Sequence, residues 1–248
     1  MFKPFFIAIQ FLTIIPVPAI KQYSEDLISR SMHYYMLTGL LIGALLYSLS
    51  LAAPFLSTDL LAGIIVVFWV IITGALHIDG LADMSDAWVG SHGDKQKFLD
   101  IMKDPYCGPV GATAILSVLL LKFLAIKTLL TQDAVWVLIF IPAFTRLGAS
   151  FLLIYTRYLR KQGLGTPLTR QKLSVLYWLQ LVTLTAVLFY ISGFYLWPVI
   201  VIAVCGHFIF RLVMLKKLGG ITGDITGAYI EIFETSFLLA FSIFFLVH

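Results

Sequence analysis

Residues 60–86 read LLAGIIVVFWVIITGAL and then HIDGLADMSD, and this stretch decides the fold that we expect. The first part, residues 60–76, is apolar and free of charge, which is typical of a helix that enters a bilayer. The second part, residues 77–86, carries three aspartates directly after that run. The stretch therefore predicts a membrane helix that ends in an acidic cluster at one face of the membrane.

The composition of the whole chain has the same character. Its 248 residues are 60% hydrophobic and only 12% charged, with a mean hydropathy of +0.97. These values predict an all-α, polytopic transmembrane helix bundle in the lipid bilayer, with residues 1–248 forming a single integral membrane domain. The net charge of +4 comes without a basic tract, so it indicates loop residues and no nucleic-acid partner. The sequence leaves open whether the protein is a homo-oligomer.

Charge-free runs predict about seven spans. Four of these spans cover residues 32–53, 60–77, 109–130 and 134–155. Two more lie between residues 173 and 210, with a break near residues 192–198, and the last runs from residue 228 to the C-terminus. Residues 2–20 are shorter and end in prolines, so we expect an interfacial or re-entrant helix there. Lys122 and Lys127 lie toward the far end of the third span, where long side chains snorkel to the membrane surface.

Lysine and arginine alternate between the connections. Residues 21–30, 78–108, 156–172 and 211–224 contain them, whereas residues 54–59, 131–133 and 192–198 contain none. The positive-inside rule places the basic connections in the cytoplasm. We therefore expect the acidic stretch and the glycine-rich turn before the last span to share the cytoplasmic face.

Three aspartates in the acidic stretch recur at helical spacing. Asp79, Asp83 and Asp86 stand at i, i+4 and i+7, so on a helix they point to one side. Six of the thirteen acidic residues lie between Asp79 and Asp104. Stacked carboxylates repel one another unless a cation lies between them, and oxygen ligands favour Mg²⁺ that also holds substrate phosphates. The alternative is a solvated first turn whose acids favour the helix N-terminus.

A glycine-rich turn precedes the last span. Its candidate residues are Gly219, Gly220, Thr222 and Gly223, and the acids Asp224, Glu231 and Glu234 follow. Glycines let backbone N–H groups approach an anion closely, and the next helix presents its positive end to the same place. The alternative is a flexible turn with an acidic helix start.

Three more residues are candidates for the site. Lys103, beside Asp104, can hold a phosphate, or its segment simply closes a loop onto the next helix. Arg146 lies midway along an apolar span, where a charge costs about 2.5–3.5 kcal/mol, so it either pairs with an aspartate or contacts a phosphate. His77 adjoins the first aspartate and is an acid–base or substrate-binding candidate, although a lone histidine at a helix end is more often structural.

Together these groups predict displacement at phosphorus. Carboxylates would hold Mg²⁺, a pyrophosphate group would bridge the metal and Lys or Arg side chains, and one aspartate would act as base toward an acceptor hydroxyl.

Three motifs resemble those of the cobalamin synthase family. They are residues 77–86, HIDGLADMSD; residues 102–111, with MKD and two glycines; and residues 219–234, from GGITGD to Glu234. Residues 10–18, QFLTIIPVP, are similar to the family's N-terminus, and the resemblance covers essentially the full chain. One departure is Ala87-Trp88, because the family tends to have a glycine soon after the third aspartate.

The resemblance implies an inner-membrane enzyme of bacteria or archaea that joins adenosylcobinamide-GDP to α-ribazole, or its 5′-phosphate, and releases GMP with Mg²⁺. It implies metal-site candidates Asp79, Asp83 and Asp86, with Asp104, Asp224, Glu231 and Glu234 as second-cluster acids. The catalytic candidates are Asp83, Asp79, Asp86 and His77. The substrate-binding candidates are Lys103, Asp104, Arg146, Gly219, Gly220, Thr222 and Gly223.

Two other functions compete with this interpretation. A CDP-alcohol phosphotransferase also uses membrane helices, Mg²⁺ and an Asp-Gly-x-x-Ala core, but its pattern has arginine after the alanine, where this chain has Asp83. A cation-coupled transporter would place polar groups near the bilayer midplane, often in repeated halves, and no repeat is visible here. An assay with a CDP-activated substrate separates the two enzymes.

Overall fold

The computed structural model describes residues 2–18, 20, 24–160, 166–170, 174–193 and 196–247. These residues form helices and no β-strand, apart from one isolated bridge between Tyr158 and Ile221. The first half contains α1 (Lys3–Leu12), α2 (Glu25–Ser31), η1 (Met32–Tyr34), α3 (Tyr35–Ser50), α4 (Thr58–Ile72), α5 (Leu76–Gly90) and α6 (Lys95–Ile101). The second half contains α7 (Pro109–Thr131), η2 (Val135–Ile139), α8 (Ile141–Tyr155), η3 (Pro167–Arg170), α9 (Val175–Ser192), α10 (Trp197–Leu218) and α11 (Gly223–Val247).

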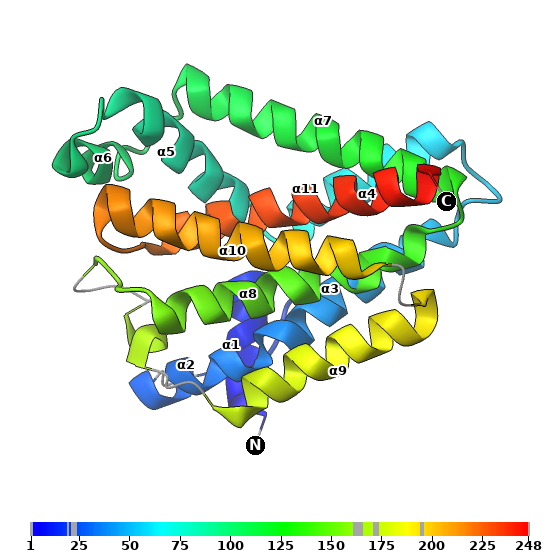
Figure 1. Ribbon diagram of the computed structural model, residues 1–248, viewed down its shortest axis with the longest axis horizontal. Coiled ribbons are helices and arrows are strands. Elements are labelled where there is room, and N and C mark those ends of the chain that lie inside the picture. The colour runs from blue at the N-terminus through cyan, green and yellow to red at the C-terminus, as the bar shows by residue number, and fades with distance from the viewer. Residues whose placement is uncertain are drawn as a thin grey trace.

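The structure confirms a polytopic helix bundle. Six helices are long and apolar enough to cross a membrane: the continuous run Glu25–Ser50, α7, the run Val135–Tyr155, α9, α10 and α11. They lie roughly side by side along one direction (Figure 1). The expected seventh span becomes a bent pair, α4 and α5, so the number reaches seven only if this pair counts as one span. With ten residues, α1 is about 15 Å long and too short to cross a hydrocarbon core of about 30 Å.

The break between α4 and α5 sets the direction of the acidic helix. The two helix axes differ by 87°. Gly74 and Ala75 both have positive φ, 61° and 56°, and for alanine this conformation is uncommon. The N-terminal segment fastens the break, because the N–H of Ile14 donates to the carbonyl of Ile72 at 2.8 Å. As a result α5 turns away from α4 and carries its aspartates toward one end of the bundle.

Burial separates an inner layer of helices from an outer one. The span that ends in α8 is the most buried, and α11 is also largely enclosed, whereas α9 and α10 expose most of their surface. α11 packs against α5, α7 and α8. The start of α11 therefore lies beside the acidic helix, and the outward faces of α9 and α10 suit contact with lipid.

The basic connections gather at one end of the bundle. Figure 1 shows α5, α6 and the turn from α10 to α11 at that end, with the C-terminus at the other. The end of α8, from which the connection at residues 156–174 begins, lies there too. Lys21, Lys161 and Lys172, which contribute to the expected charge alternation, lie outside the described residues, as does the side chain of Arg170.

Candidate active site

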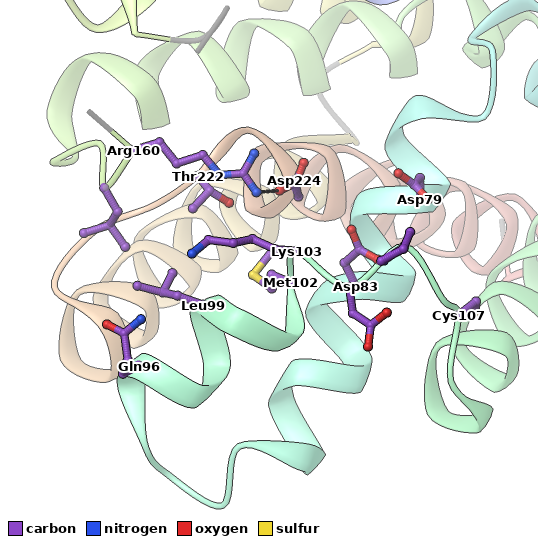
Figure 2. A pocket seen from close by; sticks show the side chains of 13 residues that line it. Asp79, Asp83, Gln96, Leu99, Met102, Lys103, Cys107, Arg160, Thr222 and Asp224 are labelled. Atoms are coloured by element: carbon purple, nitrogen blue, oxygen red, sulfur yellow. Dashed lines mark hydrogen bonds and ion pairs between the residues drawn. The ribbon is translucent and has the colours of Figure 1, made fainter. Parts of the chain in front are cut away.

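A pocket of about 800 Å³ lies at the end of the bundle that carries the basic connections. Its lining comes from α5, α6, the connection to α7, the segment after α8 and the start of α11. The lining residues are Asp79, Asp83, Gln96, Leu99, Met102, Lys103, Asp104, Pro105, Cys107, Leu159, Arg160, Thr222 and Asp224. Figure 2 shows Asp79 and Asp83 projecting from α5, while Arg160 reaches in from another segment. Polar groups from distant parts of the sequence therefore meet in one cavity.

Asp79 and Asp83 are one helical turn apart on α5. Asp79 is exposed and Asp83 is half-buried, and neither carboxylate has a hydrogen bond or ion pair with another described residue. Partial burial and the nearby carboxylates of Asp79, Asp224 and Asp86 raise the pKa of Asp83 to about 6, and Arg160 opposes that shift. The pocket therefore holds uncompensated negative charge.

Asp86 lies on the same helix but has a different environment. It does not line the pocket. Its two carboxylate oxygens accept hydrogen bonds from the backbone N–H groups of Gly108, at 2.7 Å, and Gly111, at 2.9 Å. These N–H groups begin α7 and have no partner within that helix, so Asp86 acts as its N-terminal cap. A Cβ atom on either glycine would collide with the carboxylate, which explains why glycine suits both positions.

Lys103 and Asp104 line the pocket from the connection between α6 and α7. The Lys103 ammonium lies 3.2 Å from the carboxylate of Asp100, and both side chains are largely exposed. An exposed pair of this kind contributes little stability, so Lys103 is free to turn toward a ligand. The carboxylate of Asp104 accepts a hydrogen bond from the N–H of Tyr106.

The glycines of the glycine-rich turn shape the backbone between α10 and α11 and do not line the pocket. Gly219 has a φ of 74° and ends α10, and its N–H donates to the carbonyl of Leu215. Gly220 lies so close to the carbonyl of Arg157 that a Cβ atom would not fit. Thr222 caps the start of α11 through a bond from the N–H of Ile225 and lines the pocket, whereas the three candidate glycines do not.

Asp224 lines the pocket and pairs with a residue that the sequence did not single out. Nη2 of Arg160 donates to Oδ2 of Asp224 at 2.6 Å. In the sequence, Arg160 is one of several basic residues in the connection at residues 156–172. The excess of arginine and lysine in that connection indicates that a cation could reach the acidic helix. Nothing in the sequence selects which of these residues does so.

The other candidates form a separate, buried ion-pair network. Nζ of Lys122 lies 2.8 Å from a carboxylate oxygen of Glu231 and 2.7 Å from one of Glu234, and Arg146 pairs with Glu234. Nδ1 of His77 lies 3.4 Å from Arg146. These five side chains are all buried and none lines the pocket. Glu231 and Glu234, predicted beside the metal, thus already have cationic partners.

Two expectations change as a result. The expectation that Lys122 snorkels to the surface is wrong, because its side chain is only 3% exposed and lies over the ring of Trp69. Two carboxylates on α11 stabilise the ammonium inside the bundle, so it has no need to reach water. Of the two partners expected for Arg146, the aspartate is replaced by Glu234, and contact with a phosphate stays a prediction.

The pocket residues fit a magnesium ion that a few carboxylates hold together with waters and substrate phosphates. Within the described parts of the chain, no three His, Cys, Asp or Glu side chains already surround a common point. Mg²⁺ does not require such a cage, since one or two carboxylates usually hold it together with waters and substrate phosphates. Asp79 and Asp83, which have no partner among the residues that the structure describes, and Asp224 beside them supply oxygen ligands of the required kind.

The fold and this pocket define a multi-pass membrane protein with an acidic site at one end of its helix bundle. The chain belongs to the cobalamin-5-phosphate synthase family, whose model matches residues 4–242. It is accordingly a transferase of cobalamin biosynthesis, which decides against the transporter.

Individual relatives agree with the family match. A protein of Acinetobacter baumannii ATCC 17978 is 40% identical over 98% of this chain and 99% of its own length. A protein of Pseudomonas fluorescens Pf0-1 is 37% identical over 97% of this chain and 99% of its own. Both are named adenosylcobinamide-GDP ribazoletransferase. No solved structure gives a significant match to this chain.

Proposed function

We propose that the chain joins adenosylcobinamide-GDP to α-ribazole, or to its 5′-phosphate, and releases GMP, with the pocket beside α5 as the reaction site. The observation that carries this proposal is the meeting of Asp79, Asp83 and Asp224 with Lys103 and Arg160 in one cavity. Carboxylates and cations together suit a metal-bound diphosphate, and the family and the names of the relatives supply the substrate.

The reaction would be a displacement at the phosphorus nearer cobinamide. A ribose hydroxyl oxygen of the ribazole, one that stays free when the 5′ position carries a phosphate, forms a new bond to this phosphorus, the bond to the bridging oxygen breaks, and that oxygen leaves with GMP. The hydroxyl proton passes to a carboxylate, for which Asp79 and Asp83 are the candidates because their oxygens have no partner among the described residues.

Asp79, Asp83 and Asp224 would hold Mg²⁺, which neutralises charge on the diphosphate. Lys103 and Arg160 would orient the phosphate oxygens. Most of the catalytic effect then comes from positioning and charge stabilisation, as is usual in phosphoryl transfer. Asp86 and the buried network would support this site without touching the substrate.

The site would face the cytoplasm from the inner membrane. The support is that α5 and α6, which line the pocket, lie at the same end of the bundle as the basic connections (Figure 1), together with the positive-inside rule.

GMP release by the purified chain in liposomes tests the function. We expect GMP only when adenosylcobinamide-GDP, α-ribazole and Mg²⁺ are all present. Asp83→Ala should abolish turnover, whereas Asp133→Asn, at an exposed turn of the opposite end, should leave it unchanged. Full turnover by folded Asp83→Ala protein would remove the pocket from the mechanism. Product from a CDP-activated alcohol instead would favour the phosphotransferase alternative.

A further inference from the structure

Arg160 occupies a defined position in the pocket. Its guanidinium lies 2.6 Å from the carboxylate of Asp224, and the two side chains are 39% and 29% exposed. Figure 2 shows Arg160 reaching across Thr222 to Asp224, with Lys103 below them. The pair is therefore at the pocket wall, within reach of a ligand, and is not part of the bundle interior.

The backbone that carries Arg160 is held in place. The N–H of Leu159 donates to the carbonyl of Ile221 at 2.8 Å, and the N–H of Ile221 donates to the carbonyl of Arg157 at 2.9 Å. Gly220 permits this approach, because a side chain there would collide with Arg157. The glycine-rich turn thus fixes the residue just before Arg160 against the start of α11.

The charges that line the pocket are unequal. Four carboxylates, those of Asp79, Asp83, Asp104 and Asp224, face two cations, Lys103 and Arg160. Lys103 pairs with Asp100, which is not a lining residue, so among the lining residues Arg160 alone pairs with a carboxylate of the pocket. Asp224 is consequently the lining carboxylate whose charge is already neutralised.

We propose that Arg160 is a substrate-binding residue that exchanges partners, pairing with Asp224 in the ligand-free site and with a diphosphate group when substrate binds. The diphosphate as ligand rests on the proposed function. A guanidinium presents two parallel N–H donors that match phosphate oxygens better than a single carboxylate oxygen. Because an ion pair that water reaches at the pocket wall contributes only modest stability, the exchange costs little, and it releases Asp224 to face a metal ion.

Binding of inorganic pyrophosphate to the full chain in detergent, with EDTA present, tests this exchange by calorimetry. Arg160→Gln should weaken binding by about tenfold or more, as expected for loss of a charged hydrogen bond. Arg160→Lys should keep part of the affinity. Asp224→Asn should strengthen binding, because it frees Arg160 and removes a negative charge. Arg157→Gln, an exposed arginine of the same segment, is the matched control and should bind as wild type does.

The opposite changes in pyrophosphate affinity expected for Arg160→Gln and Asp224→Asn distinguish a substrate-binding role from a structural one. If the Arg160–Asp224 pair only held the segment in place, both Arg160→Gln and Asp224→Asn would weaken pyrophosphate binding, and that result overturns the proposal. So does unchanged binding by folded Arg160→Gln, or a wild-type protein that does not bind pyrophosphate. Failure of the proposed function appears elsewhere, as absent GMP release by wild-type protein that binds pyrophosphate with the expected pattern.

Discussion

At the scale of single residues, Asp83 and Asp86 lie on one helix but in opposite electrostatic environments. Asp83 points into a cavity among other carboxylates, whereas Asp86 has a backbone N–H donor on each oxygen. The Asp83 carboxylate is ionised at a cost to the fold, whereas the Asp86 carboxylate satisfies two backbone donors. Substitutions at the two positions should therefore change stability in opposite directions.

Asp83→Asn is expected to stabilise the metal-free protein while removing its activity. The pKa of Asp83 is about 6 in the folded chain and 3.8 in its reference state, so ionisation above pH 6 opposes folding. After a discount for exposure, we expect a gain on the order of 1 kcal/mol at pH 7.5 that disappears below about pH 4, where both states are protonated. Thermal unfolding in EDTA against pH measures this, and a gain independent of pH would contradict it.

Asp86→Ala should destabilise the protein by about 1–2 kcal/mol, because two N–H groups at the start of α7 lose their acceptors. Asp86→Asn should lose less, since its amide keeps one acceptor oxygen. Unfolding in EDTA is again the measurement, so that metal loss plays no part. A rise in stability like that expected for Asp83→Asn would instead place Asp86 in the acidic cluster.

At the scale of helices, the buried network fastens α7 and α8 to α11. Lys122, Arg146, Glu231 and Glu234 balance two positive charges with two negative ones where water cannot compensate. Removing one member leaves an unpaired charge among apolar side chains. The network should therefore matter far more to stability than an ion pair at the surface.

Lys122→Met tests this at the middle of α7. We expect a loss of about 3–5 kcal/mol, the usual cost of breaking a buried ion pair. Lys127→Met is the matched control on the same helix, because Lys127 pairs with Asp59 in an exposed position and should cost about 0–1 kcal/mol. Unfolding by a denaturing detergent compares them, and equal losses would contradict the role of the network.

Helices were easier to predict than the partners of their charged residues. The apolar runs predicted spans at 109–130 and 134–155, and the structure has Pro109–Thr131 and Val135–Tyr155. Asp79, Asp83, Lys103, Asp104, Thr222 and Asp224, all candidates from the sequence, line one pocket. The sequence could not reveal that Glu231 and Glu234 pair with Lys122, or that Arg160 meets Asp224, because such contacts depend on how distant helices pack.

At the scale of the whole molecule, one end of the bundle differs from the other. The pocket, α6 and the basic connections share an end, and short connections with little charge occupy the opposite end (Figure 1). This asymmetry predicts a single orientation in the membrane. The pocket would open to the side of the membrane that holds the basic connections, which the positive-inside rule makes the cytoplasm.

Cysteine labelling in intact cells checks the orientation. In a chain with Cys107 and Cys205 replaced by serine, we expect Gln132→Cys to react with a membrane-impermeant maleimide from outside. Asp94→Cys should react only after the cells are opened, because Asp94 lies at the pocket end, directly before α6. External labelling of Asp94→Cys alone would reverse the orientation.

The buried network also bears on how the chain is made. Lys122 and Arg146 leave the ribosome long before their partner Glu234, which follows them by 112 and 88 residues. Until α11 is inserted, α7 and α8 carry unpaired cations, each costing about 2.5–3.5 kcal/mol in the bilayer. The last helix therefore completes assembly, and chains truncated before residue 223 should be retained by the insertion machinery or degraded.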